Sequence, residues 1–263
     1  MRGRIIVLVS VLLAAAGSAF LLAALNAGES AAGVVTTASD AVTLASAYTG
    51  LPEDAAASAV ERVVTDASVP VFEVKDLPVW EVTYEGITIA VPGPEGKEEQ
   101  NPNIHTVTVW VDRETGALIK VFTPTPAEGA LTDLVGPAQA GMLSGNGFTL
   151  KAAPEAPGKP LLAALPGVHM QFPGAVMQAK QMGAYYGLLT RKLGLETRFV
   201  DRPAWLVYLG GVSQPFASTG PAGGPPRPPV VGSEALVILD ATSGRPLSAL
   251  LTHQVPQASP PES

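Results

Sequence analysis

The residues that could do chemistry in this chain are few and widely spaced. None of the 263 residues is cysteine, which excludes thiol catalysis, disulfides and cysteine metal sites. Histidine occurs at His105, His169 and His253, once in each region of the chain and without metal-ligand spacing. The sequence lacks the HExxH, P-loop, GxGxxG and GxSxG patterns. It therefore predicts no catalytic, cofactor-binding or metal-binding residue.

Ser144 and three acidic residues are the remaining candidates for chemistry. Ser144 lies among small residues in M-L-S-G-N-G, but the second glycine of a nucleophile elbow is misplaced. Asp112 with Glu114, and Asp240, could bind a cation through carboxylate oxygens. However, both aspartates head a D-x-x-[TS]-G sequence, in which an Asp side chain accepts backbone N–H bonds and fixes a turn. We interpret them as turn residues.

Composition and charge narrow the class of protein. The chain is 47% hydrophobic and 15% charged, as globular proteins are. Its 27 glycines and 25 prolines predict long irregular connections. The net charge of −7 argues against nucleic-acid binding, which needs a cationic surface to displace phosphate counterions, although a local basic patch remains possible.

Residues 1–27 predict a membrane anchor. Arg2 and Arg4 precede an uncharged run over residues 5–25, long enough to cross a hydrocarbon core of about 30 Å. The cationic end should stay in the cytoplasm, which makes the rest of the chain extracytoplasmic. A cleaved signal peptide, with small residues at Gly17 and Ala19, is the alternative. We expect a single-pass protein of the cell membrane, or a secreted protein after cleavage.

The elements that must position the candidate residues begin after a small, polar spacer over residues 28–38. Ser39 and Asp40 favour the start of a short helix that stops at Gly50. Pro52 and two following acids start a second predicted helix over 53–67, with apolar residues at 4-3-4 spacing. The residues that follow predict strands near 70–75 and 79–91 with a turn at 76–78. After them come a predicted polar loop over 92–103 and a strand–turn–strand over 104–121.

The second half repeats this order. Residues 124–172 are rich in proline, glycine and alanine and are interpreted as a connecting segment that hides a short helix. Apolar residues at 4-3-4-3-4 spacing predict a helix over 174–193. The remaining predicted elements are extended chain over 195–212, a loop over 213–233, a strand–turn–strand over 234–251, and a disordered tail over 253–263.

Six residues recur in the same order and at nearly equal spacing in both halves, which indicates duplicated structure. Each half has D-x-P-x-W, an alternating strand, and D-x-x-[TS]-G with a closing strand. The tryptophans are interpreted as core residues; a paired platform for a ligand is the alternative. The two sets are Asp76, Pro78, Trp80, Asp112, Thr115 and Gly116, and Asp201, Pro203, Trp205, Asp240, Ser243 and Gly244.

These segments resemble a known family. V-T-V-W-V-D-R-E-T-G-A-L-I in the first half resembles the signature of the PepSY family of extracytoplasmic bacterial domains. V-I-L-D-A-T-S-G-R-P-L in the second half resembles it more loosely, with Ser for Thr and a Pro in the closing strand. The resemblance covers roughly residues 55–122 and 174–251. It implies small α+β modules of protease propeptides and membrane-tethered envelope proteins, which bind or restrain protein partners and carry no catalytic residue.

The predicted fold class is therefore α+β: two tandem repeats, each with a helix packed on a small antiparallel sheet, preceded by a single N-terminal transmembrane helix. The repeats should span 39–123 and 173–252. Whether they form two domains or one continuous sheet is left open.

The predicted function is a membrane-anchored extracytoplasmic binding or regulatory module without catalysis. Its partner should be an envelope protein, such as a protease, and not a nucleic acid. One alternative is a scaffold subunit of an envelope complex, with contacts through the loops 92–103 and 213–233. The P-P-R-P-P sequence around Arg227 could dock as polyproline II or be a plain loop. Another alternative is an extracytoplasmic hydrolase with an unrecognised site, which would cluster acidic, histidine and serine side chains in one pocket.

Overall fold

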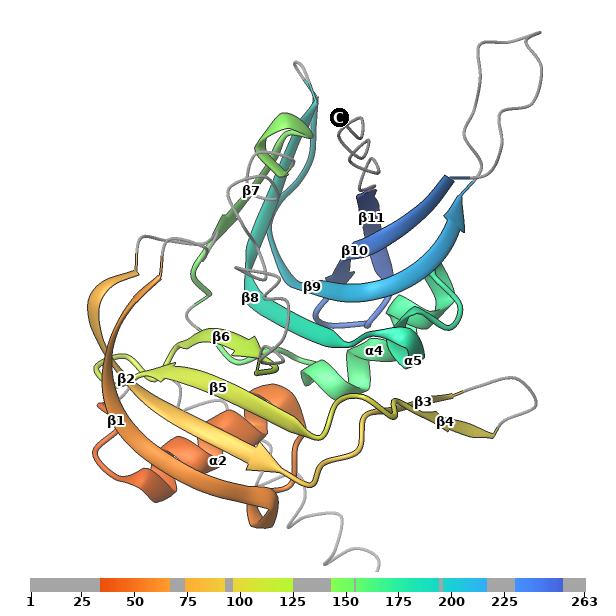
Figure 1. Cartoon of the computed structure of the whole chain (residues 1–263). Coiled ribbons are helices and arrows are strands. Elements are labelled where there is room, and N and C mark those ends of the chain that lie inside the picture. Colours follow the sequence, from red (N-terminus) through yellow and green to blue (C-terminus); the bar gives the residue numbers. More distant parts are fainter. Residues whose placement is uncertain are drawn as a thin grey trace, which may run out of the picture.

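A computed structural model describes residues 34–66, 74–92, 97–124, 143–153, 155–193, 196–216 and 230–252. Figure 1 shows the arrangement of the elements. Those of the first half are α2 (Ala38–Thr49), a 3-10 turn η2 (Glu53–Ala55), β1 (Ala56–Asp66), β2 (Val74–Glu85), β3 (Ala90–Pro92), β4 (Glu98–Gln100), β5 (Thr106–Asp112) and β6 (Leu118–Phe122). Those of the second half are β7 (Phe148–Lys151), α4 (Leu161–Gln171), α5 (Ala175–Gln178), β8 (Gln181–Leu193), β9 (Glu196–Phe216), β10 (Val230–Asp240) and β11 (Pro246–Thr252).

One antiparallel sheet runs through both halves. Within the described residues it has nine strands, eight of them in the order β1-β2-β5-β6-β8-β9-β10-β11, while β7 pairs with the outer part of β8. The halves meet where β6 pairs with β8 through Val121 with Ala184 and Phe122 with Gly183. The strands β3 and β4 form a separate hairpin in place of the predicted loop over 92–103.

The predicted fold class is wrong, because the chain is mostly one antiparallel sheet and not two small helix-on-sheet repeats after a transmembrane helix. The strands of the two halves instead share a single ladder. None of the helices in the described ranges is long and apolar enough to cross a membrane. The predicted anchor over 1–27 and the predicted tail over 253–263 lie outside the described residues.

The helix predicted over 53–67 is a strand. Its first residues form the turn η2, and β1 then pairs with β2. The 4-3-4 spacing was misleading because Val60 and Val63, which should have faced a core, are 41% and 70% exposed. Only Val64 of this strand is buried. β-branched valines lose side-chain freedom in a helix and favour a strand when a neighbouring strand is present.

The helix predicted over 174–193 is also mostly a strand. Its first residues form the single turn α5, and β8 follows from Gln181. Both faces of β8 are apolar and buried, with Met182 and Tyr186 on one face and Tyr185 and Leu189 on the other. In a strand that is buried on both faces, apolar and polar residues do not alternate. Its apolar residues can therefore match the spacing expected of an amphipathic helix.

Two helices cover one face of the sheet, called the helix face below. The helix α2 begins after the N-cap Thr37 and ends at Gly50, which takes the left-handed conformation expected there. The helix α4 lies within 124–172, where a short helix was expected in the connecting segment. Val35 is 2% exposed, so the end of the predicted spacer is packed. The strands β9 and β10 extend into the predicted loop over 213–233, whose central residues, including Arg227, lie outside the described ranges.

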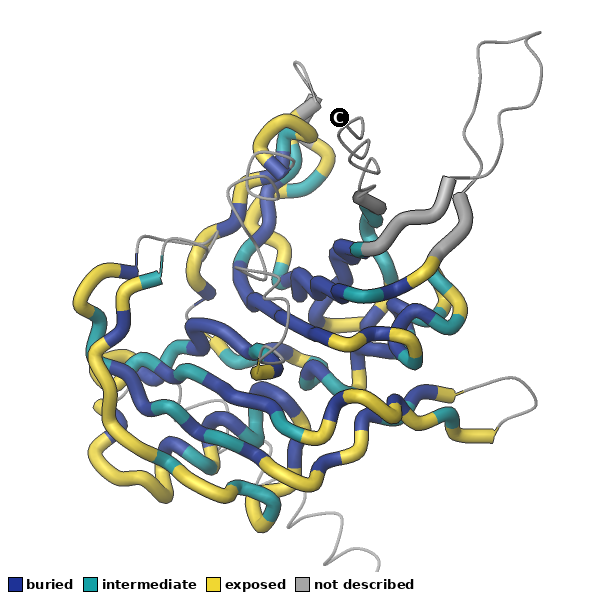
Figure 2. Tube along the Cα trace, in the orientation of Figure 1, coloured by how far each residue is buried: buried dark blue, intermediate teal, exposed yellow. Residues whose placement is uncertain are grey.

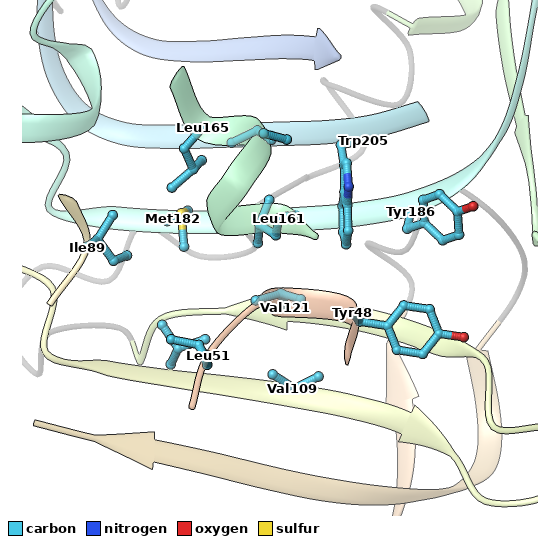
Figure 3. Packing of buried hydrophobic residues seen from close by; sticks show 14 of the residues in the cluster. Tyr48, Leu51, Ile89, Val109, Val121, Leu161, Leu165, Met182, Tyr186 and Trp205 are labelled. Atoms are coloured by element: carbon cyan, nitrogen blue, oxygen red, sulfur yellow. The ribbon is translucent and has the colours of Figure 1, made fainter. Parts of the chain in front are cut away.

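Side chains of both halves form one core on the helix face. Figure 3 shows Tyr48 of α2 near Tyr186 of β8, and Trp205 of β9 beside Tyr186. The ring centroids of the two tyrosines are 6.3 Å apart, and those of Tyr186 and Trp205 are 5.2 Å apart. Burial raises the pKa of Tyr186 to about 12. Buried Asn101 also joins the halves, since its Nδ2 donates to the Val176 and Ala179 carbonyls at 2.5 and 2.9 Å.

Candidate functional site

Two aspartates head the turns that close the last hairpin of each half. Asp112 Oδ1 accepts the backbone N–H groups two and three residues later, at 2.7 and 3.1 Å. Asp240 Oδ1 accepts the equivalent groups at 3.1 and 2.6 Å. Each turn ends in a glycine with positive φ, 72° at Gly116 and 73° at Gly244. The turns predicted from D-x-x-[TS]-G are confirmed, and both carboxylates are engaged in them.

Asp240 is the more deeply buried of these two aspartates, with 6% of its side chain exposed. Its Oδ2 accepts a hydrogen bond from Arg202 Nε at 2.5 Å. Burial alone raises the pKa of this carboxyl, but hydrogen bonds from Ser243 and Arg202 and the charge of Arg202 outweigh burial. The pKa of Asp240 therefore lies below its usual value.

A second matched pair of aspartates, Asp76 and Asp201, lies inside the strands β2 and β9. Both have positive φ, 49° and 48°, which is uncommon for a residue other than glycine. The Asp76 N–H donates to the Thr65 hydroxyl at 3.0 Å, and the Asp201 N–H donates to the Thr190 hydroxyl at 3.1 Å. The turn predicted at 76–78 is wrong, because the chain continues there as one strand with a bulge.

The two tryptophans of the repeated pattern are core residues. Trp80 is 7% exposed and donates Nε1–H to the Val35 carbonyl at 2.9 Å. Trp205 is fully buried and donates to the Lys159 carbonyl at 3.0 Å. Each therefore fastens the segment that precedes the helix of its half. The alternative of a paired ligand platform is not compatible with this burial.

The strand β1 forms one edge of the sheet, since β2 is its single partner among the described strands. Figure 2 shows that it is exposed along most of its length, whereas the central strands are buried. Edge strands leave a row of backbone N–H and C=O groups able to pair with another chain. Val60 and Val63 add exposed apolar side chains to this edge.

The charges that could protect this edge are turned onto the faces of the sheet. Glu61 Oε2 lies 2.8 Å from Arg113 Nη1, and Arg62 Nε lies 2.7 Å from Glu81 Oε1. Charged residues that point outward usually prevent edge strands from pairing with other chains. With eleven residues, β1 is longer than β11, the strand of seven residues at the other end of the sheet order.

The face of the sheet opposite α2 and α4, called the back face, carries charge in the first half. Lys120 Nζ lies 2.7 Å from Asp66 Oδ2, and their side chains are 9% and 13% exposed. The same ammonium lies 5.6 Å from the ring centroid of Trp110 and 5.3 Å from that of Phe122. Trp110 donates its Nε1–H to Glu81 at 3.1 Å. This set is called the lysine cluster below.

The back face of the second half carries a cleft of about 230 Å³. It opens beside β7, where that strand pairs with β8. Arg191, opposite Phe148 in this pairing, has its guanidinium carbon 4.7 Å from the centroid of the Phe148 ring. The cleft is lined by Leu143, Ser144, Phe148, Thr149, Leu150, Leu189 and Leu206.

The residues singled out for chemistry do not come together. Ser144 lines the apolar cleft, which no histidine or carboxylate lines. His105 Nε2 lies 3.1 Å from the Pro102 carbonyl, His169 lies in α4, and His253 is outside the described ranges. Among the described residues, no three or more histidine, aspartate or glutamate side chains could together hold a metal ion.

No family model matches the chain, and no curated protein or solved structure is significantly similar to it. The resemblance of the two turn segments to PepSY domains therefore stays a prediction.

Sequence reasoning missed both the edge of β1 and the cleft. The run V-E-R-V-V at residues 60–64 is rich in β-branched residues and could have indicated a strand. The alternation of F-T-L-K at residues 148–151 could have indicated β7. No local signal places Arg191 beside Phe148, because that contact depends on the pairing of β7 with β8.

Proposed function

We propose that this chain is a non-catalytic binding module on the outer side of a membrane, where it docks an extended segment of an envelope protein, such as a protease, along β1. The observation that carries this proposal is the long exposed edge with Val60 and Val63. The apolar run over residues 5–25 supports the location. The PepSY resemblance supports a protein partner.

Addition of a strand gives affinity through main-chain hydrogen bonds and specificity through alternate side chains. The edge of β1 offers both. Val63 stands opposite Pro78 of β2, and Val60 stands opposite Glu81, so the two valines lie on opposite faces of the sheet. A partner strand with apolar residues on both faces would cover both valines.

Photo-crosslinking in native membranes tests the proposal. A benzophenone amino acid at position 63 should give one discrete crosslinked protein. The same residue at position 200 is the matched control, because Val200 is 64% exposed and Val63 is 70% exposed, but Val200 lies away from β1. Equal products from both positions, or none from position 63, would contradict docking along β1.

Proline substitution tests whether the partner adds as a strand. Backbone N–H groups point alternately toward and away from β2, so one of Val60→Pro and Glu61→Pro removes an outward donor and the other breaks a bond to β2. The variant that removes an outward N–H donor should keep the thermal stability of the wild type and lose the crosslink. A crosslink that survives in both folded variants would show that the partner binds side chains and not the strand edge.

A further inference from the structure

We propose that the cleft beside β7 binds the alkyl chain of a medium-chain fatty acid, with its carboxylate on Arg191. This site lies on the back face of the second half, away from the edge of β1, and does not depend on docking there.

The cleft is built to hold an apolar chain. Five of its lining residues are leucines or phenylalanine, at Leu143, Phe148, Leu150, Leu189 and Leu206. Its only side-chain polar groups are the hydroxyls of one serine and one threonine. A peptide entering this cleft would leave main-chain polar groups without partners, which is costly, whereas an alkyl chain has none. A volume of about 230 Å³ is below the range of about 300–1,000 Å³ for drug-sized ligands, which favours a single short chain.

Arg191 supplies a charge next to this cleft, through its contact with the lining residue Phe148. It lies on the same face of β8 as Leu189, two residues away, and stacks on the Phe148 ring. Its Nε is buried and has no hydrogen-bond partner. In the described part of the chain no carboxylate forms an ion pair with it. A guanidinium in this state is suited to a carboxylate, which it can bind through two parallel hydrogen bonds.

The duplicated fold does not require this arrangement. The pairing of β8 with β9 has the same register and the same bulge as the pairing of β1 with β2. In this register Arg191 occupies the position of Asp66, and Leu206 occupies the position of Glu81. In the first half these positions hold an ion pair and a hydrogen bond to Trp110. The second half replaces two acids with an arginine and a leucine, which changes a self-satisfied face into one with an open apolar cleft and a free cation.

The test is a titration of the full chain in lipid nanodiscs with decanoate labelled with ¹³C at the carboxyl carbon, with empty nanodiscs as the blank. A bound carboxyl resonance should appear with the protein. Competition by hexanoate, octanoate and decanoate should strengthen about threefold to fourfold per added methylene, as burial of one CH₂ predicts. Decanol, which has the same chain without the charge, should compete at least tenfold more weakly than decanoate.

Two neighbouring variants separate the site from general adsorption. Arg191→Gln should weaken decanoate binding at least tenfold and leave decanol binding unchanged. Lys192→Gln is the matched control, because Lys192 is the adjacent cation and is exposed. The proposal would be overturned if the two variants had equal effects, or if competition did not depend on chain length. It would also be overturned if an apolar peptide with a free C-terminus displaced the labelled decanoate and unlabelled decanoate did not.

Discussion

The two halves of the sheet have the same strand registers but different back faces. Trp80 pairs with Glu61 and Val111, and Trp205 pairs with Tyr186 and Leu239, at equivalent positions. The bulges also recur, between Trp110 and Val111 in β5 and between the equivalent residues of β10. On the back face, however, the positions of Asp66, Glu81 and Lys120 in the lysine cluster are held in the second half by Arg191, Leu206 and Ser248, and the cleft lies there.

This difference separates what the fold requires from what it tolerates. The turn aspartates, the bulge aspartates and the tryptophans make the same hydrogen bonds in both halves. They set backbone direction, so a duplicated backbone needs them twice. The back-face residues do not set the backbone direction through such hydrogen bonds, so they can differ between the halves. Any difference in role between the halves should therefore arise on that face. Variants at equivalent positions test this division.

The largest expected effect is at Asp66. Asp66→Asn removes the carboxylate charge 2.7 Å from the Lys120 ammonium, whose side chain is 9% exposed. Loss of one member of a buried pair should lower the free energy of unfolding by about 3 kcal/mol, measured by urea denaturation. Glu61→Gln breaks an ion pair whose side chains are 50% and 45% exposed and should cost under about 1 kcal/mol.

A double variant, Asp66→Leu with Lys120→Leu, should recover most of that stability, because packed apolar residues can replace a buried ion pair with little loss of stability. If the double variant is no more stable than Asp66→Asn, the first half needs its charges, and the division between the faces is wrong.

A smaller effect is expected at Gly187, which pairs with Ala204 as Arg62 pairs with Val79 in the first half. A Cβ at Gly187 would lie 2.4 Å from the backbone oxygen of Lys151, so Gly187→Ala must displace β7. The cost should be about 2 kcal/mol, with faster amide hydrogen exchange in β7. Arg62→Ala, at the equivalent exposed position, should cost under about 1 kcal/mol. Unchanged exchange in β7 would show that the strand adapts without moving away.

The smallest effect compares the two turn aspartates. Asp240→Asn removes the ion pair with Arg202 and should cost about 1 kcal/mol at pH 7, while Asp112→Asn, at the more exposed turn, should cost less. Because the folded-state pKa of Asp240 is lowered, its contribution is full above the usual carboxyl pKa of about 3.9 and is lost as the pH falls through the folded value. Denaturation series from pH 7 to 2 should show a shallower acid loss for Asp240→Asn. Parallel curves for this variant and the wild type would contradict that linkage.

Local features of this fold could be predicted from sequence and non-local ones could not. The turns at Asp112 and Asp240 follow from side-chain bonds within three residues, so the pattern was sufficient. The strands β1 and β8 were predicted as helices, because apolar spacing alone does not report a neighbouring strand. The continuous sheet depends on two residue pairs between β6 and β8, for which neither half carries a local signal.

The candidate sites divide in the same way. The structural role of the tryptophans could be predicted from residue type and position. The exposed edge required knowledge that β1 is the outermost strand. The cleft required the pairing of β7 with β8, which brings Phe148 to Arg191 across more than forty intervening residues.

The narrow seam between β6 and β8 has a consequence for how the protein is made. The first half is complete as a chain at Thr123, but Tyr48 and Val121 are buried on the core shared with Tyr186 and Ala184, which are synthesised later. During synthesis, the first half therefore presents an unpaired strand and an exposed apolar surface until β8 has emerged. Such surfaces are prone to aggregation. Biogenesis of this chain thus calls for a holding chaperone or for rapid completion of the second half, and a product truncated after Thr123 should self-associate through β6.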